Sequence, residues 1–367
     1  MIIKEIIESL NNWIPQKAAQ EKDNVGIQVG RLNKKTKNIL ISLELNHDVI
    51  SEAIKNKCNL IITHHPLIFY PFYSIKPEND DLSKIIEILI KNNITVFSMH
   101  TNLDSAREGV SFELAKRLGL SNIKFLDNQK ANQFKLAVFV PEKFIDKVSG
   151  AIFNAEAGII GEYKKCSFRS KGIGTFEGSA ETNPTIGKKL NFEKVDEVRL
   201  EFIVDSWNLN NIISEMLKSH PYEEPAYDIY PLENYNTNFG LGTIGIYEKA
   251  KTTDEFVSFV KNKLKLKAIK YCKGKSDKIK KVAVCGGSGA DLINQAIKMN
   301  ADAFVSADIK YSHFRDAENQ ILLVDAGHYE TEIFSVDIIA KEIKKIVTDK
   351  TIKIIKAKTN TNPIKIK

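Results

Sequence analysis

The sequence predicts an α/β protein in which two similar α/β lobes form one domain, with a separate α+β domain inserted between them. Two observations support this. Apolar runs alternate with helical patterns near both ends of the chain, whereas the middle third carries longer strands with partial period-two alternation. The 367 residues also suit two or three domains at ~150 residues each.

The first part of the chain, residues 1–130, predicts one half of an α/β domain. Its continuous apolar runs predict strands, and the segments between them carry apolar residues at helical spacing. The expected strands are 38–43, 60–63 and 94–98, and the expected helices are 49–54, 82–90 and 108–118. Fully apolar strands that alternate with helices indicate a parallel sheet covered on both faces.

The middle part, residues 131–234, predicts a ferredoxin-like module. Strands are expected at 134–140, at the glycine-punctuated segment 172–178 and at 198–204, with helices at 142–154 and 209–218. A β-α-β-β-α-β order is the order of that module.

The last part, residues 235–367, predicts the second half of the α/β domain. Strands are expected at 282–285, 303–306 and 321–324, and helices at 291–299 and 329–346. Residues 352–358 alternate Ile or Ala with Lys, as the solvated face of an edge strand does. The outer parts therefore resemble each other, and the middle part is an insertion.

Charge and composition argue against nucleic acid and membrane as partners. The net charge is +7, but residues 341–367 alone hold nine Lys and two acidic residues, so the rest of the chain is neutral. Only six of the 53 basic residues are Arg, the residue of bidentate phosphate and base recognition. No apolar run approaches the ~20 residues that span a bilayer, no signal peptide is evident, and four scattered cysteines indicate reduced thiols. We expect a cytoplasmic protein.

Histidines and acidic residues follow three of the expected strands. His64 and His65 come directly after strand 60–63, and His100 and Asp104 follow strand 94–98. His328 and Glu332 follow strand 321–324, four residues apart on one helix face. Because ligands bind at the carboxyl ends of strands in open α/β sheets, we expect these side chains to meet at one edge of one sheet.

This set of side chains predicts a metal centre. A single histidine at a strand end is more often structural, but three strand ends that deliver His64, His65, Asp104, His328 and Glu332 favour metal ligands. Nitrogen and oxygen ligands without thiolates suit Zn, Mn, Fe(II), Co or Ni. Two ions ~3.5–4 Å apart need a bridging carboxylate, for which Glu332 is the candidate. Glu332 and His100 are also candidates for proton transfer, although His100 is expected mainly to orient Asp104 or a water.

Two further features leave alternatives open. Gly286-Gly-Ser-Gly289 lies between an expected strand and helix and either holds a phosphate on backbone N–H groups or forms a tight turn for packing. The remaining histidines, His47, His220 and His313, are expected to be structural, although His313 also follows a strand.

Several stretches resemble the Nif-three-like family, whose members carry the label GTP cyclohydrolase 1 type 2 homologue. The stretches in the outer parts are Asp23-Asn-Val-Gly-Ile-Gln-Val-Gly30, Thr63-His-His-Pro-Leu67, His100-Thr-Asn-Leu-Asp104, Gly286–Gly289, Asp308-Ile-Lys-Tyr311 and Gly327-His-Tyr-Glu-Thr-Glu332. In the middle part, Gly158-Ile-Ile-Gly161, Cys166-Ser-Phe168, Gly172–Phe176 and His220-Pro-Tyr-Glu-Glu224 resemble the PII-like insertion of the longer members.

The resemblance implies a dinuclear metal site on His64, His65, Asp104, His328 and Glu332. Glu332 would bridge the ions, with His65 and Asp104 completing one shell and His64 and His328 the other. It also implies a toroidal homohexamer. One departure from the family pattern is Ser306-Ala-Asp308, where a glycine more often precedes the acidic residue.

Three functions remain open at this point. The first is a metal-dependent hydrolase that attacks a nucleotide, or another small phosphorylated or cyclic-amide substrate, with metal-bound water. The second is a non-catalytic metal-handling or regulatory protein whose inserted domain senses a ligand. The third, nucleic-acid binding through the basic end of the chain, is the least favoured. No guanine-specific motif supports GTP itself.

Overall fold

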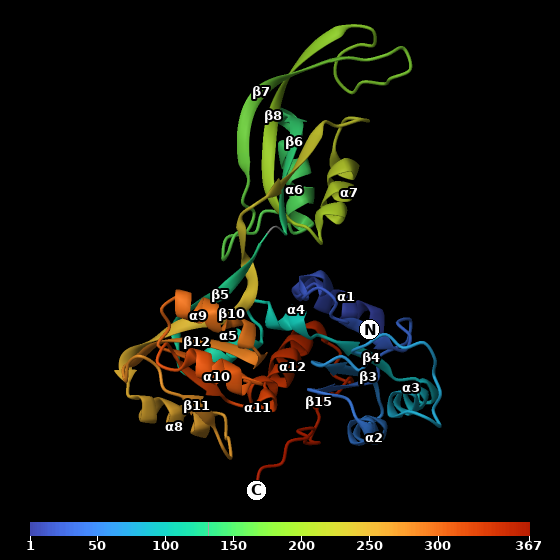
Figure 1. The fold of residues 1–367 in the computed structure, drawn as a ribbon. Helices are drawn as coiled ribbons and strands as arrows, with labels where there is room; N and C mark the ends of the chain where they lie inside the picture. The colour runs from blue at the N-terminus through green and yellow to red at the C-terminus, as the bar shows by residue number, and fades with distance from the viewer. Residues whose placement is uncertain (131) are drawn as a thin grey trace. The chain divides into compact units, whose positions relative to one another are not determined.

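The computed structural model describes residues 1–130 and 132–367, which form two compact units. One unit comprises Met1–Asp127 and Phe239–Lys367, and the other comprises Asn128–Asn238. The fold is α/β, with helices and strands in both units (Figure 1). The expected boundary between residues 130 and 131 falls at Ala131, which lies outside the described residues.

The first unit contains a five-stranded sheet in the order β1-β4-β3-β2-β15. Its strands are β1 (Gly26–Val29), β2 (Asn38–Ser42), β3 (Cys58–Thr63), β4 (Thr95–Ser98) and β15 (Ile354–Lys356). The four strands from β15 to β4 run parallel, as predicted, but β1 pairs antiparallel with β4. The expectation of a purely parallel sheet was therefore wrong at this edge. The edge is formed by the short strand β1, which begins at Gly26 and ends just before Gly30.

A six-stranded sheet in the same unit has the order β11-β14-β13-β12-β10-β5. Its strands are β5 (Ser121–Lys130), β10 (Tyr235–Lys251), β11 (Lys270–Cys272), β12 (Ile279–Ser288), β13 (Ala303–Ala307) and β14 (Leu322–Asp325). The three central strands β12, β13 and β14 are parallel, and antiparallel β11 and β10 flank them. The sequence analysis did not predict β5, β10 or β11.

Each of the two sheets contains one strand from the other outer part of the chain. The last strand, β15, pairs with β2 in the first sheet, and β5 from the first part belongs to the second sheet (Figure 1). The basic end of the chain is thus an edge strand, as predicted. Residues 235–367 are not a self-contained lobe, because their last strand completes the other sheet.

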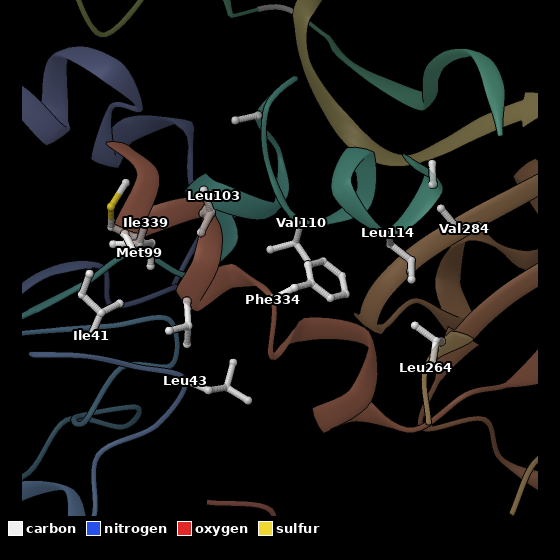
Figure 2. Packing of buried hydrophobic residues seen from close by; sticks show 14 of the residues in the cluster. Ile41, Leu43, Met99, Leu103, Val110, Leu114, Leu264, Val284, Phe334 and Ile339 are labelled. Atoms are coloured by element: carbon white, nitrogen blue, oxygen red, sulfur yellow. The ribbon is translucent and has the colours of Figure 1, made fainter. Parts of the chain in front are cut away.

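Helices cover both faces of each sheet in this unit. They are α1 (Ile3–Trp13), α2 (His47–Lys55), α3 (Asp81–Lys91), α4 (Thr101–Asp104), α5 (Val110–Arg117), α8 (Thr253–Lys263), α9 (Ile293–Lys298), α10 (Tyr311–Ala317), α11 (His328–Glu332) and α12 (Ser335–Ile346), with short 3₁₀ turns η1 (Gln16–Ala18) and η3 (Ala290–Leu292). The largest core cluster joins the two sheets: Ile41 of the first sheet and Val284 of the second lie in one buried group with Met99, Leu103 and Val110 (Figure 2). Successive strand residues point to opposite faces, so Leu40 and Ile61 pack instead with α2 and α3.

The expected helix 329–346 is two helices, α11 and α12. The helix is interrupted at Ile333 and Phe334. Phe334 is buried in the same core cluster (Figure 2), and the centroid of its ring lies 4.9 Å from the Arg117 guanidinium carbon. The helical period alone does not reveal this break, because apolar residues continue through it. The break separates the segment that carries His328 and Glu332 from the helix that packs on β2 and β15.

The second unit is an antiparallel sheet with helices on one face. Strands β6 (Gln133–Pro141), β7 (Phe168–Glu177), β8 (Phe192–Asp205) and β9 (Tyr227–Leu232) have the order β7-β8-β6-β9. The 3₁₀ turn η2 (Glu142–Phe144) and helices α6 (Ile145–Asn154) and α7 (Leu209–Ser219) complete the unit. Ile152 and Met216 from the helices pack against Leu136 and Phe202 of the sheet. Among the described residues, no helix is long and apolar enough to cross a bilayer.

Candidate metal centre

The histidine and acidic side chains gather where strands from both sheets end. His64 and His65 follow β3, His100 follows β4, and Asp104 ends α4. His328 and Glu332 lie on α11, directly after β14 of the other sheet. The expectation of a single sheet edge was therefore wrong. The core cluster packs the two sheets together, so that the carboxyl ends of their strands face a common site.

Glu332 lies at the centre of this group and is almost fully buried. Its Oε2 lies 2.8 Å from His65 Nε2 and 2.8 Å from His328 Nε2. Its other oxygen, Oε1, lies 3.9 Å from His64 Nε2. One carboxylate thus reaches all three histidines with different oxygens, which is the arrangement that a bridging ligand requires.

His64 and Asp104 supply two buried polar atoms that lack partners. His64 Nε2 and Asp104 Oδ1 lie 3.5 Å apart, and neither has a hydrogen-bond partner in the part of the chain that the structure describes. Buried polar groups are nearly always hydrogen-bonded, so such a pair requires an explanation. A divalent cation bound by both atoms would satisfy them.

Three overlapping sets of side chains bring their donor atoms within 4.8 Å of one another. They are His65, His328 and Glu332; His64, Asp104 and Glu332; and His64, His65 and His100. The first two sets share Glu332 and contain all five predicted ligands. They group the ligands differently from the expected partition, because His65 lies with His328 and His64 lies with Asp104.

Each of the three predicted histidine ligands has an acceptor on its second ring nitrogen. His64 Nδ1 lies 2.8 Å from the Met99 carbonyl oxygen, and His65 Nδ1 lies 3.2 Å from a Glu44 oxygen. His328 Nδ1 lies 2.7 Å from Asp308 Oδ2. Such partners fix the tautomer and the ring orientation of metal-binding histidines, so that Nε2 is the atom that would face an ion.

His100 is held by Asp23, a contact that the sequence analysis did not predict. Its Nδ1 lies 2.9 Å from Asp23 Oδ1. The backbone N–H and the hydroxyl of Thr101 donate to the other oxygen of Asp23, at 3.1 and 2.5 Å. Burial alone would raise the pKa of Asp23, but the hydrogen bonds from His100 and Thr101 lower it to about 2. Asp23 is therefore a fixed negative charge behind His100.

The charges of the site are strongly coupled. Burial opposes a charge on His65, but its hydrogen bonds to Glu332 and Glu44 raise its pKa to about 10. Burial likewise opposes a charge on His328, and its contacts with Glu332 and Asp308 raise its pKa to about 9. The same histidines hold the pKa of Glu332 well below its usual value despite burial. Protons on these histidines thus balance Glu332, and a bound cation would replace them.

The glycines at the end of β12 make room for Glu332. Gly287 has a φ of +59°, and a Cβ there would lie 2.0 Å from Glu332 Oε1. The N–H groups of Gly286 and Gly287 donate to the hydroxyls of Ser111 and Thr331. Two donors of the turn are therefore engaged, which favours the packing interpretation of Gly286–Gly289 over a phosphate site.

The sequence analysis did not assign roles to three acidic residues that support the site. Glu44 and Asp308 follow the ends of β2 and β13, and Asp23 precedes β1. The same criterion that selected His64 and His328, an ionisable side chain just beyond a strand end, selects Glu44 and Asp308. The histidines expected to be structural include His47, which pairs with Asp81 at 2.8 Å, and His220, which contacts the Phe139 carbonyl oxygen at 3.0 Å.

A family model described as Duf34/NIF3 (NGG1p interacting factor 3) matches residues 1–363 of the chain. The chain belongs to the NIF3 family. Proteins named "GTP cyclohydrolase 1 type 2 homolog" from Halalkalibacterium halodurans and Bacillus subtilis are each 38% identical to it. The alignments cover 94% of this chain and 93% of the first relative, and 98% and 97% for the second.

Solved structures of similar proteins have the same fold. A Bacillus cereus protein related to NIF3 has a TM-score of 0.86 and 36% identity, with 100% of this chain and 99% of that chain covered. A Staphylococcus aureus protein with 29% identity has a TM-score of 0.75 at the same coverage. The identity of this NIF3 family member therefore rests on sequence and fold over its whole length.

Proposed function

We propose that this NIF3 family member binds two divalent metal ions and is a metal-dependent hydrolase. Its substrate would be a nucleotide or another small phosphorylated or cyclic-amide molecule. The observation that carries the proposal is a pair of buried atoms next to Glu332, His64 Nε2 and Asp104 Oδ1. Neither atom has a hydrogen-bond partner among the described residues. The name of these relatives, GTP cyclohydrolase 1 type 2 homolog, supports the choice of substrate class.

The side chains present fit such a pair of ions. His65 and His328 with Glu332 would hold one ion, and His64 and Asp104 with Glu332 would hold the other. All are imidazole or carboxylate donors, which suit Zn, Mn, Fe, Co or Ni. When bound, two such ions supply Lewis acidity and lower the pKa of a coordinated water. Five side chains leave coordination positions open, as a catalytic centre needs.

His100 is the better of the two candidates for proton transfer. Glu332 Oε2 is already engaged by two histidines, and the side chain is only 4% exposed. His100 has one ring nitrogen on Asp23, so that its other nitrogen remains available near His64 and His65. A carboxylate that fixes the tautomer of an adjacent imidazole is the arrangement found behind general bases.

The inserted unit and the assembly are part of the same proposal. The chain order β6-α6-β7-β8-α7-β9 and the sheet order β7-β8-β6-β9 support a ferredoxin-like, PII-like module. We also propose a homohexamer in the cytoplasm that does not bind nucleic acid. Light scattering of the purified protein tests the assembly, and a monomer would contradict it.

The test compares metal content and turnover in matched variants. The wild type, His65→Ala, Glu332→Ala and the control His47→Ala are loaded with Mn²⁺ or Zn²⁺ and assayed on GTP and a phosphoester panel. His47 is an exposed histidine of the same unit that pairs with Asp81. We expect His65→Ala and Glu332→Ala to lose metal and turnover together, and His47→Ala to retain both.

The opposite outcome favours the metal-handling alternative. If the loaded wild type turns over none of these substrates but transfers its metal to an apo-acceptor, the hydrolase proposal is wrong. If Glu332→Ala retains full metal content, the proposed ligand set itself is wrong.

A further inference from the structure

An exposed aromatic segment follows the paired histidines directly. Residues 67–76, between β3 and α3, contain Phe69, Tyr70, Phe72 and Tyr73, which are all exposed large apolar side chains. An aromatic side chain left in water forgoes the gain of burying 150–250 Å². Of these four residues, Phe69 is the one whose ring contacts the site.

Phe69 lies against His100. The ring centroids are 6.3 Å apart at an interplanar angle of 67°, so the imidazole meets the phenyl ring at its edge or face and does not stack flat on it. The His100 ring is itself 5.4 Å from both His64 and His65. Phe69 remains 54% exposed despite these contacts, so much of its ring surface is open beside the metal centre.

The backbone next to Phe69 is fixed by two side chains. The Ile68 N–H donates to Gln28 Oε1 at 3.1 Å, and the Ile68 carbonyl accepts from Asn24 Nδ2 at 2.7 Å. Gln28 Nε2 in turn donates to the Asn24 carbonyl at 2.8 Å. The short segment 23–28 therefore holds both His100, through Asp23, and the base of the aromatic segment, through Asn24 and Gln28.

His100 and Phe69 lie beside His65, one of the partly exposed ligands of the proposed centre. His64 is fully buried, and Glu332 is nearly so, whereas the side chains of His65 and His328 are 20% and 31% exposed. Asp104 is 18% exposed, so a substrate can approach beside His65, His328 or Asp104. The rings of His65 and His100 are in contact, and Phe69 adjoins His100.

We propose that Phe69 is a wall of the substrate site and that the planar ring of a heteroaromatic substrate, such as a nucleobase, packs against it beside His100. This inference rests on the proposed function and names the part of the substrate that the protein recognises. Phe69 has no hydrogen-bonding group, so it would recognise a flat ring without distinguishing one base from another, since every base presents a π-face. Other residues would have to distinguish one base from another.

The test measures binding of GTP and of inorganic triphosphate, which lacks the ring, to the Mn²⁺-loaded full-length protein by calorimetry. The variants are Phe69→Ala, Phe69→Trp and the control Tyr73→Ala, which removes a fully exposed aromatic residue of the same segment. We expect Phe69→Ala to bind GTP about tenfold more weakly, with Phe69→Trp and Tyr73→Ala close to wild type. Triphosphate affinity and metal content should be equal in all four proteins.

Three results would overturn the inference. The first is wild-type protein that binds GTP no better than triphosphate, and the second is Phe69→Ala that binds GTP as the wild type does. The third is a change in molar mass for Phe69→Ala in light scattering, which would mean that the ring packs against another copy of the chain. Turnover separates this inference from the proposed function. If GTP binds through Phe69 but is not hydrolysed, the role of Phe69 stands and the hydrolase proposal is wrong. If GTP is hydrolysed but its ring does not bind Phe69, the hydrolase proposal stands and this inference is wrong.

Discussion

Replacing Gly287 with alanine should displace the central carboxylate of the site without removing any polar group. An added Cβ would lie 2.0 Å from Glu332 Oε1 and 3.2 Å from His328 Cε1. Real Cβ atoms essentially never approach a neighbour closer than 3.0 Å, so Oε1 must retreat by about 1 Å. The same rigid carboxylate carries Oε2, which contacts His65 and His328 at 2.8 Å.

The expected loss of metal affinity follows from that displacement. Metal–ligand distances are tolerated within about 0.2 Å, and disturbing the support of a ligand typically weakens binding about 10-fold to 100-fold. We expect a loss of that size for Gly287→Ala. The positive φ adds about 1 kcal/mol of backbone strain, which would lower the Tm by about 2–4 °C in a unit of this size.

A matched control separates strain from displacement. Gly119 has a φ of +73°, but no atom lies within 4 Å of an added Cβ. Gly119→Ala should therefore lose a similar amount of Tm and bind metal as the wild type does. Chelator competition with Zn²⁺ or Mn²⁺ gives the affinity, and thermal unfolding of the metal-free proteins gives the Tm. Equal metal affinity in Gly287→Ala and wild type, or an equal loss in Gly119→Ala, would refute the reasoning.

Two further predictions concern the acidic residues behind the histidines. Asp308→Asn should weaken metal binding about 10-fold to 100-fold, because the amide is a poorer acceptor for His328 Nδ1 than the carboxylate at 2.7 Å. Asp23→Asn should lower the free energy of unfolding by about 2 kcal/mol at pH 6, because the pKa of Asp23 falls from 3.8 to about 2 on folding. A lowered folded pKa gives stability above the unfolded pKa, so this difference should disappear as the pH falls from 4 to 2.

Each of these predictions has its own control. For Asp308, the control is Asp316→Asn, an exposed carboxylate that pairs with Arg315 and should leave metal affinity unchanged. Metal binding by Asp308→Asn at the wild-type level would show that His328 does not need its partner. For Asp23, urea unfolding at pH 6, 4 and 3 gives the comparison with wild type. A stability difference that stays constant over this range would mean that the Asp23 charge contributes nothing.

The strands that carry the site could be predicted because their sequences have few alternatives. Residues 58–63 are buried throughout, and the apolar run of residues 60–62 is followed by Thr-His-His-Pro, which disfavours continuation as a helix or as a longer strand. The β-strand and the change to ionisable residues at its end are local properties. The strands β1, β10 and β11, which pair antiparallel with their neighbours, were missed because no local pattern distinguishes them from turns or loops.

Other errors arose from contacts between segments far apart in the chain. The break between α11 and α12 depends on burying Phe334 in a core that both sheets supply. The pairing of β15 with β2 joins residues more than 300 positions apart. Neither contact follows from hydrophobic period, because the period says which residues of a segment are buried and not which segment covers them.

The sequence alone determined the chemistry of the site: which imidazole and carboxylate groups follow strand ends, and hence that His64, His65, Asp104, His328 and Glu332 are the candidate ligands. The tertiary structure decided how they are combined. It packed two sheets against each other, placed Glu332 among three histidines, and brought His100 into hydrogen-bonding contact with Asp23. The physical reason is that strand ends are fixed by local hydrophobic pattern and proline, whereas distances between ligands depend on the packing of the whole core.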